Sequence, residues 1–503
     1  MERTVSHATV ATAPPPLAHP DKFFIDGKWT APSTGARLDV ISAVTEDVYL
    51  QVAEAREADM ARAIAAARKA FDHGPWPRMS HAERAGYLRK LAEGMRQRAG
   101  DIAAMWPHEM GILHSHALLQ APGAGATFDY YADLSATFPF EERRQPSGPS
   151  PLGLVVREPV GVVGAIIPWN APAALLAWKL APALVAGCTA VLKASPEAPG
   201  APYVFAEIAE AIGLPPGVVN VVTADREVSE LLVRSTDVDK ITFTGSTAAG
   251  RRIASLCGER IARCTLELGG KSAAVILDDF DVEAAAAAIV GPACSMTGQI
   301  CSSLTRIVVT RDRHDAMVDA LAARFKAVKV GDPFDSESGI GPIAVERQRD
   351  RIERLIASGI AEGATLAAGG GRPKHLNRGF YIEPTVFGNV DNHMTIAQEE
   401  IFGPVLSVIP ARDEANAVEI ANDTIYGLNN SVFTNDVDRA YAVARQLRSG
   451  TVGHNSFRTD FRIGFGGFKQ SGIGREGNVE GLAPYLENKT VILEGFPSHI
   501  PQG

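Results

Sequence analysis

The chain has 503 residues, of which 46% are hydrophobic and 21% charged, and these near-average values exclude a disordered or fibrous body. The net charge of -9 and the lack of a long basic run argue against a nucleic-acid partner. Five cysteines are too few for a disulfide scaffold, and their odd number indicates a reducing compartment.

The N-terminal segment is rich in Pro, Ala and Thr, and we predict a flexible tail over residues 1–20. This segment has an early acidic residue and no continuous apolar stretch, unlike a secretory signal. The longest uncharged run, 159–178, is interrupted by Pro168, Asn170 and Pro172, so no membrane span is predicted. We therefore expect a cytoplasmic protein.

Two amphipathic helices are predicted first, over 57–71 and 81–105. The Pro/Gly/Ser-rich stretch 143–153 then interrupts the helical region, so 140–160 is a candidate for an extended arm or a domain crossing.

Short apolar strands then alternate with helices, a pattern that favours a parallel sheet with helical crossovers. A second α/β block follows and ends near 450–477. The predicted strands are 160–167, 189–194, 218–223 and 240–244 in the first block, and 272–279 and 305–310 in the second.

Three motif matches are rejected on their context. GIGREG (472–477) fits a dinucleotide fingerprint but follows no strand. GGKS (269–272) resembles the end of a phosphate loop, but this chain has Thr265 where such a loop requires a glycine. His114 and His116 have no metal-ligating partner at a suitable spacing, so they are interpreted as surface histidines and no metal site is predicted.

FTGSTAAG (243–250) follows a predicted strand directly and opens a helix. Ser246 is placed near the N-cap, and Gly245 allows a close backbone approach, so the free N–H groups there suit a pyrophosphate. Any strand-to-helix turn has similar features, so this motif alone does not establish a nucleotide site.

Cys301 lies in the turn GQIC (298–301), between an Ala-rich helix and a strand. Most free cysteines are inert core residues, but small polar neighbours favour an accessible nucleophile, which would need activation. Glu267 in LELGGK is the candidate base, since it ends an apolar stretch just before two glycines. A paired or solvated carboxylate is the alternative interpretation.

Together, these motifs resemble the NAD(P)-dependent aldehyde dehydrogenases over about residues 22–495. The order of the motifs and the spacing of 34 residues from Glu267 to Cys301 both match that family. The motifs are FIDGKW, IIPWNAP (166–172), LKASPEAP (192–199), FTGSTAAG, LELGGKS, GQIC, EEIFGPV (399–405) and FGGFKQSGIGRE (465–476).

The resemblance implies three catalytic residues. Cys301 would attack the aldehyde, Asn170 and the Cys301 backbone N–H would stabilise the oxyanion, and Glu267 would activate the hydrolytic water. For the cofactor, Lys193 would bind the adenosine ribose, Ser246 the pyrophosphate and Glu400 the nicotinamide ribose. The full implied cofactor set is Ile166, Ile167, Pro168, Trp169, Lys193, Phe243, Gly245, Ser246, Leu268, Gly269, Gln348, Glu400 and Phe402.

Cofactor choice is open at two places. Where many members of the family have Glu three residues after the lysine, this chain has Pro196, and Glu197 stands one place later. The turn 223–228 also lacks a glycine that is common elsewhere. We expect NAD as the better cofactor, with NADP possible.

The resemblance implies that the helix after Asn170 lines the substrate tunnel, and the small side chains at its start then predict a wide tunnel. A wide tunnel favours a bulky hydrophobic or aromatic aldehyde. His454, Arg458 and Arg462 near the expected mouth of the tunnel are a weaker argument for a substrate with an acidic tail. The implied substrate-binding residues are Ala171, Ala174, Leu175, Trp178, Ile300, Ser302 and Phe465.

The resemblance implies a Rossmann-like cofactor domain, an α/β catalytic domain and a small β oligomerisation arm. The cofactor domain is expected over 21–137 and 158–268, and the catalytic domain over 269–480. The arm is expected over 138–157 and 481–503. The arm, including the strand 487–495, would build a homodimer or homotetramer.

Several alternatives remain. A CoA-acylating enzyme would lack the base Glu267, and a semialdehyde dehydrogenase would differ only in its substrate. A catalytically silent ligand-binding or structural homologue would not need Asn170, Glu267 and Cys301 together. A cysteine-dependent esterase would leave the nucleotide-site motifs unexplained.

Overall fold

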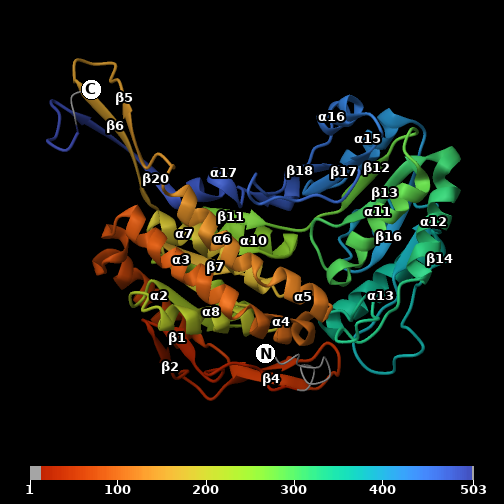
Figure 1. Cartoon of the computed structure of the whole chain (residues 1–503), viewed down its shortest axis with the longest axis horizontal. Helices are drawn as coiled ribbons and strands as arrows, with labels where there is room; N and C mark the ends of the chain where they lie inside the picture. The colour runs from red at the N-terminus through yellow and green to blue at the C-terminus, as the bar shows by residue number, and fades with distance from the viewer. Residues whose placement is uncertain (1–12, 501–503) are drawn as a thin grey trace, which may run out of the picture.

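The computed structural model describes residues 13–500, which form four sheets (Figure 1). The largest sheet has eight strands in the order β19-β11-β10-β7-β8-β9-β1-β2. Its five central strands run parallel, and residues of β7, β8 and β9 are buried throughout because helices cover both faces. The strands are β1 (Phe23–Ile25), β2 (Lys28–Thr30), β7 (Val162–Ile166), β8 (Thr189–Ala194), β9 (Val219–Thr223), β10 (Lys240–Thr244), β11 (Arg263–Glu267) and β19 (Gly472–Ile473).

Two layers of helices sandwich this sheet, and each layer has its own apolar core. One face packs against α3 (His81–Gln97), α4 (Ala99–Met110), α6 (Gly123–Leu134), α7 (Pro172–Ala186) and α8 (Gly200–Ala211). The other face packs against α2 (Glu57–His73), α9 (Arg226–Arg234) and α10 (Thr247–Glu259).

The predicted helix 81–105 is two helices in the structure. Arg98 leaves helical geometry with φ -96° and ψ 8°, between α3 and α4. Its guanidinium donates to Glu207 Oε2 at 2.8 Å and to the Pro16 carbonyl at 2.9 Å. These distant contacts hold the Arg98 side chain at the break, which the local helical periodicity does not reveal.

The chain changes face between two neighbouring strands of the large sheet. β7 leads into α7 on one face, whereas β10 leads into α10 on the opposite face, and β7 pairs with β10. Such a switch point opens a crevice at the carboxyl ends of the strands. The loops 167–171 and 245–246 border this crevice.

A second sheet has seven strands in the order β14-β15-β16-β13-β12-β17-β18, and it is on the right in Figure 1. All its strands are parallel except β14 at one edge. The strands are β12 (Ser272–Ile276), β13 (Leu304–Thr310), β14 (Thr365–Ala368), β15 (Thr385–Gly388), β16 (Val405–Ala411), β17 (Asn429–Phe433) and β18 (Thr451–His454).

Helices again cover both faces of this sheet. α11 (Val282–Cys294) and α12 (His314–Lys326) share one core with it, and α15 (Glu414–Asn422) and α16 (Val437–Ala444) share another. The remaining elements are β3 (Arg37–Ile41), β4 (Val48–Ala53), α5 (His114–Gln120), α13 (Glu346–Ala361), α14 (Thr395–Gln398) and α17 (Asn478–Leu482).

A three-stranded antiparallel sheet projects from the body, at the upper left of Figure 1. It has the order β20-β6-β5 and comprises β5 (Glu141–Arg144), β6 (Leu152–Pro159) and β20 (Leu486–Leu493). Ile492 on β20 is 61% exposed, although it belongs to a strand that pairs along its whole length with β6.

The expected flexible tail falls only partly within the described residues. Residues 1–12 lie outside them, whereas the Ala18 N–H donates to Glu207 Oε1 at 2.7 Å and Pro16 accepts from Arg98. Residues 16–18 are therefore attached to the body, in contrast to the expectation. Within residues 13–500, no helix combines the length and the apolar character that crossing a membrane requires.

Candidate active site

The carboxyl ends of four neighbouring strands bring predicted site residues into register. Ile166 on β7 lies opposite Lys193 on β8 and Phe243 on β10, and Phe243 lies opposite Leu266, one residue before Glu267. Because these strands are parallel, the chain leaves all of them at one edge, where a switch point forms a binding crevice. Pro168, Trp169, Gly245 and Ser246 follow on the loops at this edge.

Asn170 is joined to the cysteine loop by a hydrogen bond. Its Nδ2 donates to the Gln299 carbonyl at 3.0 Å, two residues before Cys301, and its own carbonyl accepts from Trp106 Nε1 at 3.0 Å. The side-chain amide is therefore held beside the thiol-bearing loop, where it can donate to an oxyanion.

The loop before Cys301 has an unusual backbone. Met296, Thr297 and Gly298 adopt φ values of 50°, 56° and 70°, and a Cβ on Gly298 would lie 2.4 Å from the Gly403 carbonyl carbon. The buried Gln299 side chain holds this loop by accepting from the Ala344 N–H at 2.9 Å. Such left-handed residues persist only where surrounding contacts enforce them, and they occur often at functional sites.

Glu267 ends β11 as a buried carboxyl group that is 3% exposed. Neither of its oxygens has a hydrogen-bond partner among the described residues. Burial raises its pKa well above the usual value, and Glu476 adds to the rise while Lys179 and Arg475 oppose it. A carboxyl group with a raised pKa and free oxygens is suited to accept a proton from water near neutral pH.

Glu267 and Cys301 share one small region. The turn after Glu267 passes so close that a Cβ on Gly270 would lie 2.3 Å from the Cys301 carbonyl oxygen. Burial raises the pKa of the Cys301 thiol, with Glu400 and Glu267 adding to the effect. The thiol is therefore protonated in the resting protein, and attack on a carbonyl carbon requires that proton to leave.

Sequence reasoning missed a buried ion pair behind Glu267. Lys179 Nζ donates to Glu476 Oε1 at 2.5 Å, and the side chains are 0% and 3% exposed. Lys179 follows Trp178 on an otherwise apolar helix, and an ammonium group there needs a partner. A lysine on an apolar helix was the signal that the sequence offered for a buried pair. The partner, Glu476, stands 297 residues later and could not be inferred.

Lys193 on β8 and Glu197 just after that strand carry opposite charges. Burial lowers the pKa of Lys193 to about 8, and no described residue accepts a hydrogen bond from its ammonium group. Glu197 is paired with Arg347 Nη2 at 2.5 Å and also accepts a hydrogen bond from Ser195 Oγ. An ammonium donor without a protein acceptor fits the hydroxyl groups of a ribose.

Ser246 caps α10, as the sequence predicts. Its Oγ accepts from the Ala249 N–H at 3.3 Å, and the residue is exposed at the edge of the crevice. Gly245 lies directly before it and donates its N–H to the Glu267 carbonyl at 3.0 Å. The first turn of α10 thus presents backbone donors and the positive end of the helix dipole to an anion.

On the opposite wall, Glu400 and Phe402 are fixed by backbone contacts. Glu400 Oε1 accepts from the Gly270 N–H at 3.1 Å, and a Cβ on Gly269 would lie 2.5 Å from Glu400 Oε2. Gln348 Nε2 donates to the Phe402 carbonyl at 3.0 Å. The Trp169 and Phe402 rings pack edge to face at 5.4 Å, so the two walls meet there.

Aromatic rings from α7 and from residues 461–465 stack on one another. Trp178 stacks on Phe461 at 3.2 Å between centroids, and Phe461 stacks on Phe465 at 4.6 Å. Beside this stack lies a cavity of about 180 Å³, lined by Ala126, Thr127, Tyr130, Tyr131, Trp178, Asp460, Phe461, Arg462 and Gly477. Phe461 and Tyr130 were not predicted as site residues.

Of the predicted substrate residues, only Trp178 lines this cavity. Ala171 precedes α7, Ala174 and Leu175 are on its first turns, and Ile300 packs on the same core. Ser302 is buried, and its carbonyl accepts from Asn429 Nδ2 at 3.1 Å. Among the basic residues, Arg462 lines the cavity, whereas His454 forms a hydrogen bond with the Thr434 carbonyl at 3.0 Å.

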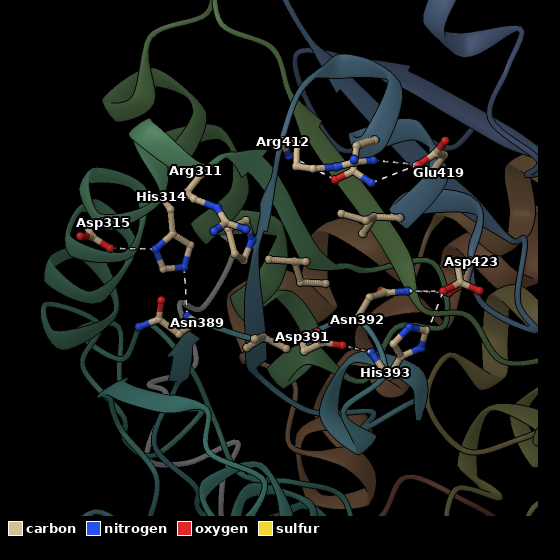
Figure 2. A pocket seen from close by; sticks show the side chains of 15 residues that line it. Arg311, His314, Asp315, Asn389, Asp391, Asn392, His393, Arg412, Glu419 and Asp423 are labelled. Carbon is tan, nitrogen blue, oxygen red and sulfur yellow. Dashed lines mark hydrogen bonds and ion pairs between the residues drawn. The ribbon is translucent and has the colours of Figure 1, made fainter.

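A larger polar cavity of about 750 Å³ lies elsewhere, at the carboxyl ends of β13 and β16 (Figure 2). His314 bonds Asp315 Oδ1 at 2.8 Å and accepts from the Asn389 N–H at 3.0 Å within it. None of the predicted site residues lines this cavity. The prediction that His114 is a surface histidine is wrong, since it is 6% exposed and packs on Phe334.

Comparisons with known proteins identify the class of enzyme. Residues 29–491 match the Aldehyde dehydrogenase family. A geranial dehydrogenase of Castellaniella defragrans is 43% identical over 476 residues, 94% of this chain and 98% of that protein. A 3-succinoylsemialdehyde-pyridine dehydrogenase of a Pseudomonas species is 41% identical over 478 residues, with coverage of 94% and 98%.

Solved structures agree with this assignment. An aldehyde dehydrogenase of Mycobacterium tuberculosis, solved with NAD⁺, has a TM-score of 0.92 and 44% identity over 95% of this chain and 99% of that one. A Pseudomonas syringae enzyme, solved with NAD⁺ and octanal, has a TM-score of 0.90 and 39% identity over 94% and 97%. The chain belongs to the aldehyde dehydrogenase family, and it is an NAD(P)-dependent oxidoreductase. The predicted family and fold class are thereby confirmed.

Proposed function

We propose that the enzyme oxidises a bulky hydrophobic or aromatic aldehyde to its carboxylic acid, with NAD as the better cofactor. The observation that carries the substrate proposal is the aromatic stack of Trp178, Phe461 and Phe465, with Ala171 and Ala174 at the start of the helix that bears Trp178. Large rings offer an apolar wall, and small side chains leave room for a large substrate. The geranial dehydrogenase relative and the neighbour solved with octanal support this proposal.

Three residues carry the chemistry in this proposal. Cys301 gives its thiol proton to a base, for which Glu267 is the candidate, and its Sγ attacks the aldehyde carbon, while Asn170 Nδ2 with the Cys301 backbone N–H stabilises the oxyanion. Bound NAD(P) would accept the hydride that the aldehyde carbon then loses, which leaves a thioester on Cys301. Glu267 then takes a proton from the water that hydrolyses the thioester, a role that its raised pKa and unpartnered oxygens support.

The crevice between β7 and β10 fits the cofactor. Lys193 would bind the adenosine ribose, Ser246 and the first turn of α10 the pyrophosphate, and Glu400 the nicotinamide ribose. The cofactor domain would comprise 21–137 and 158–268, and the catalytic domain 269–480.

The projecting sheet of β5, β6 and β20 would build a homodimer or homotetramer as the oligomerisation arm, 138–157 with 481–503. Its exposed Ile492 supports burial against another copy, since an isolated three-stranded sheet buries little apolar surface. The enzyme would act in the cytoplasm, consistent with its five free cysteines.

An aldehyde panel tests the substrate proposal. Acetaldehyde, octanal, geranial, benzaldehyde and a semialdehyde are each assayed with NAD and NADP by absorbance of the reduced cofactor. We expect kcat/KM to rise with apolar size. A semialdehyde as the best substrate would favour the alternative that the 3-succinoylsemialdehyde-pyridine dehydrogenase relative suggests. Dependence on CoA would instead indicate an acylating enzyme.

A further inference from the structure

Two cysteines lie close together, one on a helix that covers the large sheet and one on the sheet itself, and neither is the thiol of the proposed active site. Cys257 is on the last turns of α10, and Cys264 is the second residue of β11, which follows after a tight turn. The turn is closed by the Ala262 N–H, which donates to the Cys257 carbonyl at 2.9 Å, and by Ile261, which has φ 56°. A hydrogen bond joins the two thiols.

The two thiols have different surroundings. Cys257 is 1% exposed within the apolar core of its helix layer, whereas Cys264 is only half-buried and lies at the margin of that core. β11 pairs with β19 only at Leu266 and Glu267, so no strand within residues 13–500 covers this edge of β11 at Cys264. Cys264 is therefore the thiol of the pair that a small solute can reach.

Charge also distinguishes the two thiols. The hydrogen bond from Cys257 and the nearby Lys240 ammonium group lower the pKa of Cys264, whereas the same hydrogen bond and burial raise the pKa of Cys257. Lys240 is held in place, since its Nζ donates to Thr265 Oγ1 at 2.7 Å. A thiolate stabilised by an adjacent thiol and a cation is the form that reacts with oxidants.

We propose that Cys264 is a peroxide-reactive thiol and that Cys257 resolves its oxidised form into an intramolecular disulfide. In the first step the Cys264 thiolate attacks hydrogen peroxide, an S–O bond forms, the O–O bond breaks, and the released hydroxide takes a proton to become water. Cys264 is thereby oxidised by two electrons to a sulfenic acid, and the peroxide is reduced. Cys257 then attacks this sulfur, an S–S bond replaces the S–O bond, and the leaving hydroxide becomes water with the proton of Cys257.

The other cysteines are poorer targets for a peroxide. Burial raises the pKa of Cys188 to about 11 and that of Cys294 to about 12, and the thiol of Cys301 is also protonated at rest. The pair is also separate from the proposed catalytic residues, since Cys264 is three residues before Glu267 on β11. Ser246 and Glu267 stand at the opposite ends of α10 and β11 from the turn that joins them.

Peptide mass spectrometry tests the proposal on the full-length protein. The protein is treated with increasing hydrogen peroxide at neutral pH without cofactor or aldehyde, alkylated under denaturing conditions and digested without reductant. We expect a peptide pair joined through Cys257 and Cys264, lighter by two hydrogens, to appear while Cys294 and Cys301 remain alkylated. Because the thiolate is the reactive form, the lower pKa of Cys264 predicts that it reacts with peroxide about tenfold faster than Cys294.

Two variants separate the roles of the two cysteines. Cys257→Ser should leave Cys264 as a sulfenic acid that dimedone traps, whereas Cys264→Ser should abolish the disulfide and slow oxidation of Cys257 about tenfold. Cys294→Ser is the matched control and should behave as the wild type. Oxidation of Cys301 before Cys264, a disulfide between subunits, or full alkylation of both cysteines at high peroxide would overturn the proposal. None of these readouts depends on dehydrogenase activity.

Discussion

Lys179 and Glu476 form a buried ion pair directly behind Glu267, with 2.5 Å between Nζ and Oε1. Glu476 is held at its backbone as well, because it exchanges two hydrogen bonds of 2.7 Å with Phe465. Burial is the main cause of the raised pKa of Glu267; the negative charge of Glu476 adds to the rise, and the ammonium group of Lys179 opposes it. The pair thus adjusts the proton affinity of the proposed base.

Glu476→Gln should shift the acid limb of the pH–rate profile to lower pH. Removal of the neighbouring negative charge leaves Lys179 unopposed, so the pKa of Glu267 falls and the base is deprotonated at lower pH. The shift is measured from kcat between pH 5 and pH 9, values chosen to bracket neutral pH. A profile identical to that of the wild type would show that another group controls this limb.

Lys179→Met should destabilise the protein by about 3–5 kcal/mol, because it leaves a buried carboxylate without its partner. Urea unfolding monitored by tryptophan fluorescence measures the loss. The double variant Lys179→Met/Glu476→Gln carries no unpaired charge and should recover most of it. A double variant as unstable as Lys179→Met would mean that packing, rather than charge, accounts for the loss.

Cys301→Ala should lower kcat/KM at least about 10³-fold while NAD binding, measured by calorimetry, remains within about twofold. The proposed nucleophile is lost, whereas Lys193, Ser246 and Glu400 remain. Cys294→Ala is the matched control, since Cys294 is a buried cysteine seven residues earlier. An inactive Cys294→Ala with an active Cys301→Ala would reverse the assignment.

Glu267→Gln should keep the volume of the side chain and lose the base, so turnover should fall about 10²–10⁴-fold. An acyl group should then accumulate on Cys301, because the thioester forms but hydrolyses slowly. Intact-protein mass spectrometry after mixing with aldehyde and NAD detects the added mass. Normal steady-state turnover in this variant would exclude the role.

Glu197→Gln should raise the ratio of NADP to NAD efficiency about fivefold, because it removes about 1 kcal/mol of repulsion against a 2′-phosphate. Lys193 would remain to pair with that phosphate. The matched control is Arg347→Gln, which breaks the same ion pair but keeps the carboxylate and should not raise the ratio. A wild-type enzyme without NADP activity at saturation, together with an unchanged ratio in Glu197→Gln, would contradict this interpretation.

Local patterns in the sequence predict much of this fold. The predicted strands 189–194 and 240–244 coincide with β8 and β10, because short apolar runs bounded by turn residues determine their own limits. The break at Arg98 was missed, and the Glu207 side chain that holds Arg98 there stands 109 residues later. Likewise, the ion pair of Lys179 with Glu476 and the stacking of Phe461 on Trp178 were not predicted. Both contacts form only when the C-terminal segment packs against α7, which no local pattern reveals.

Ala171→Phe should narrow the range of accepted aldehydes. Ala171 stands at the N-cap of α7, one residue after Asn170, and it is half-buried against the core on which Trp178 also packs. A phenyl ring there would occupy space that a long or cyclic substrate needs. Each methylene that the wild type buries contributes about 0.8 kcal/mol, or about fourfold in kcat/KM.

The wild type should therefore gain about fourfold per methylene from acetaldehyde upward until the space is filled, and the variant should lose that gain for octanal and geranial. Acetaldehyde serves as the internal control, because it is too small to meet the new ring and its kcat/KM should stay within about twofold. Initial rates of NADH formation across the series measure both profiles. If acetaldehyde is the best wild-type substrate, or if Ala171→Phe leaves the octanal-to-acetaldehyde ratio unchanged, the space beside Ala171 does not determine substrate size, and the proposal of a bulky substrate falls with it.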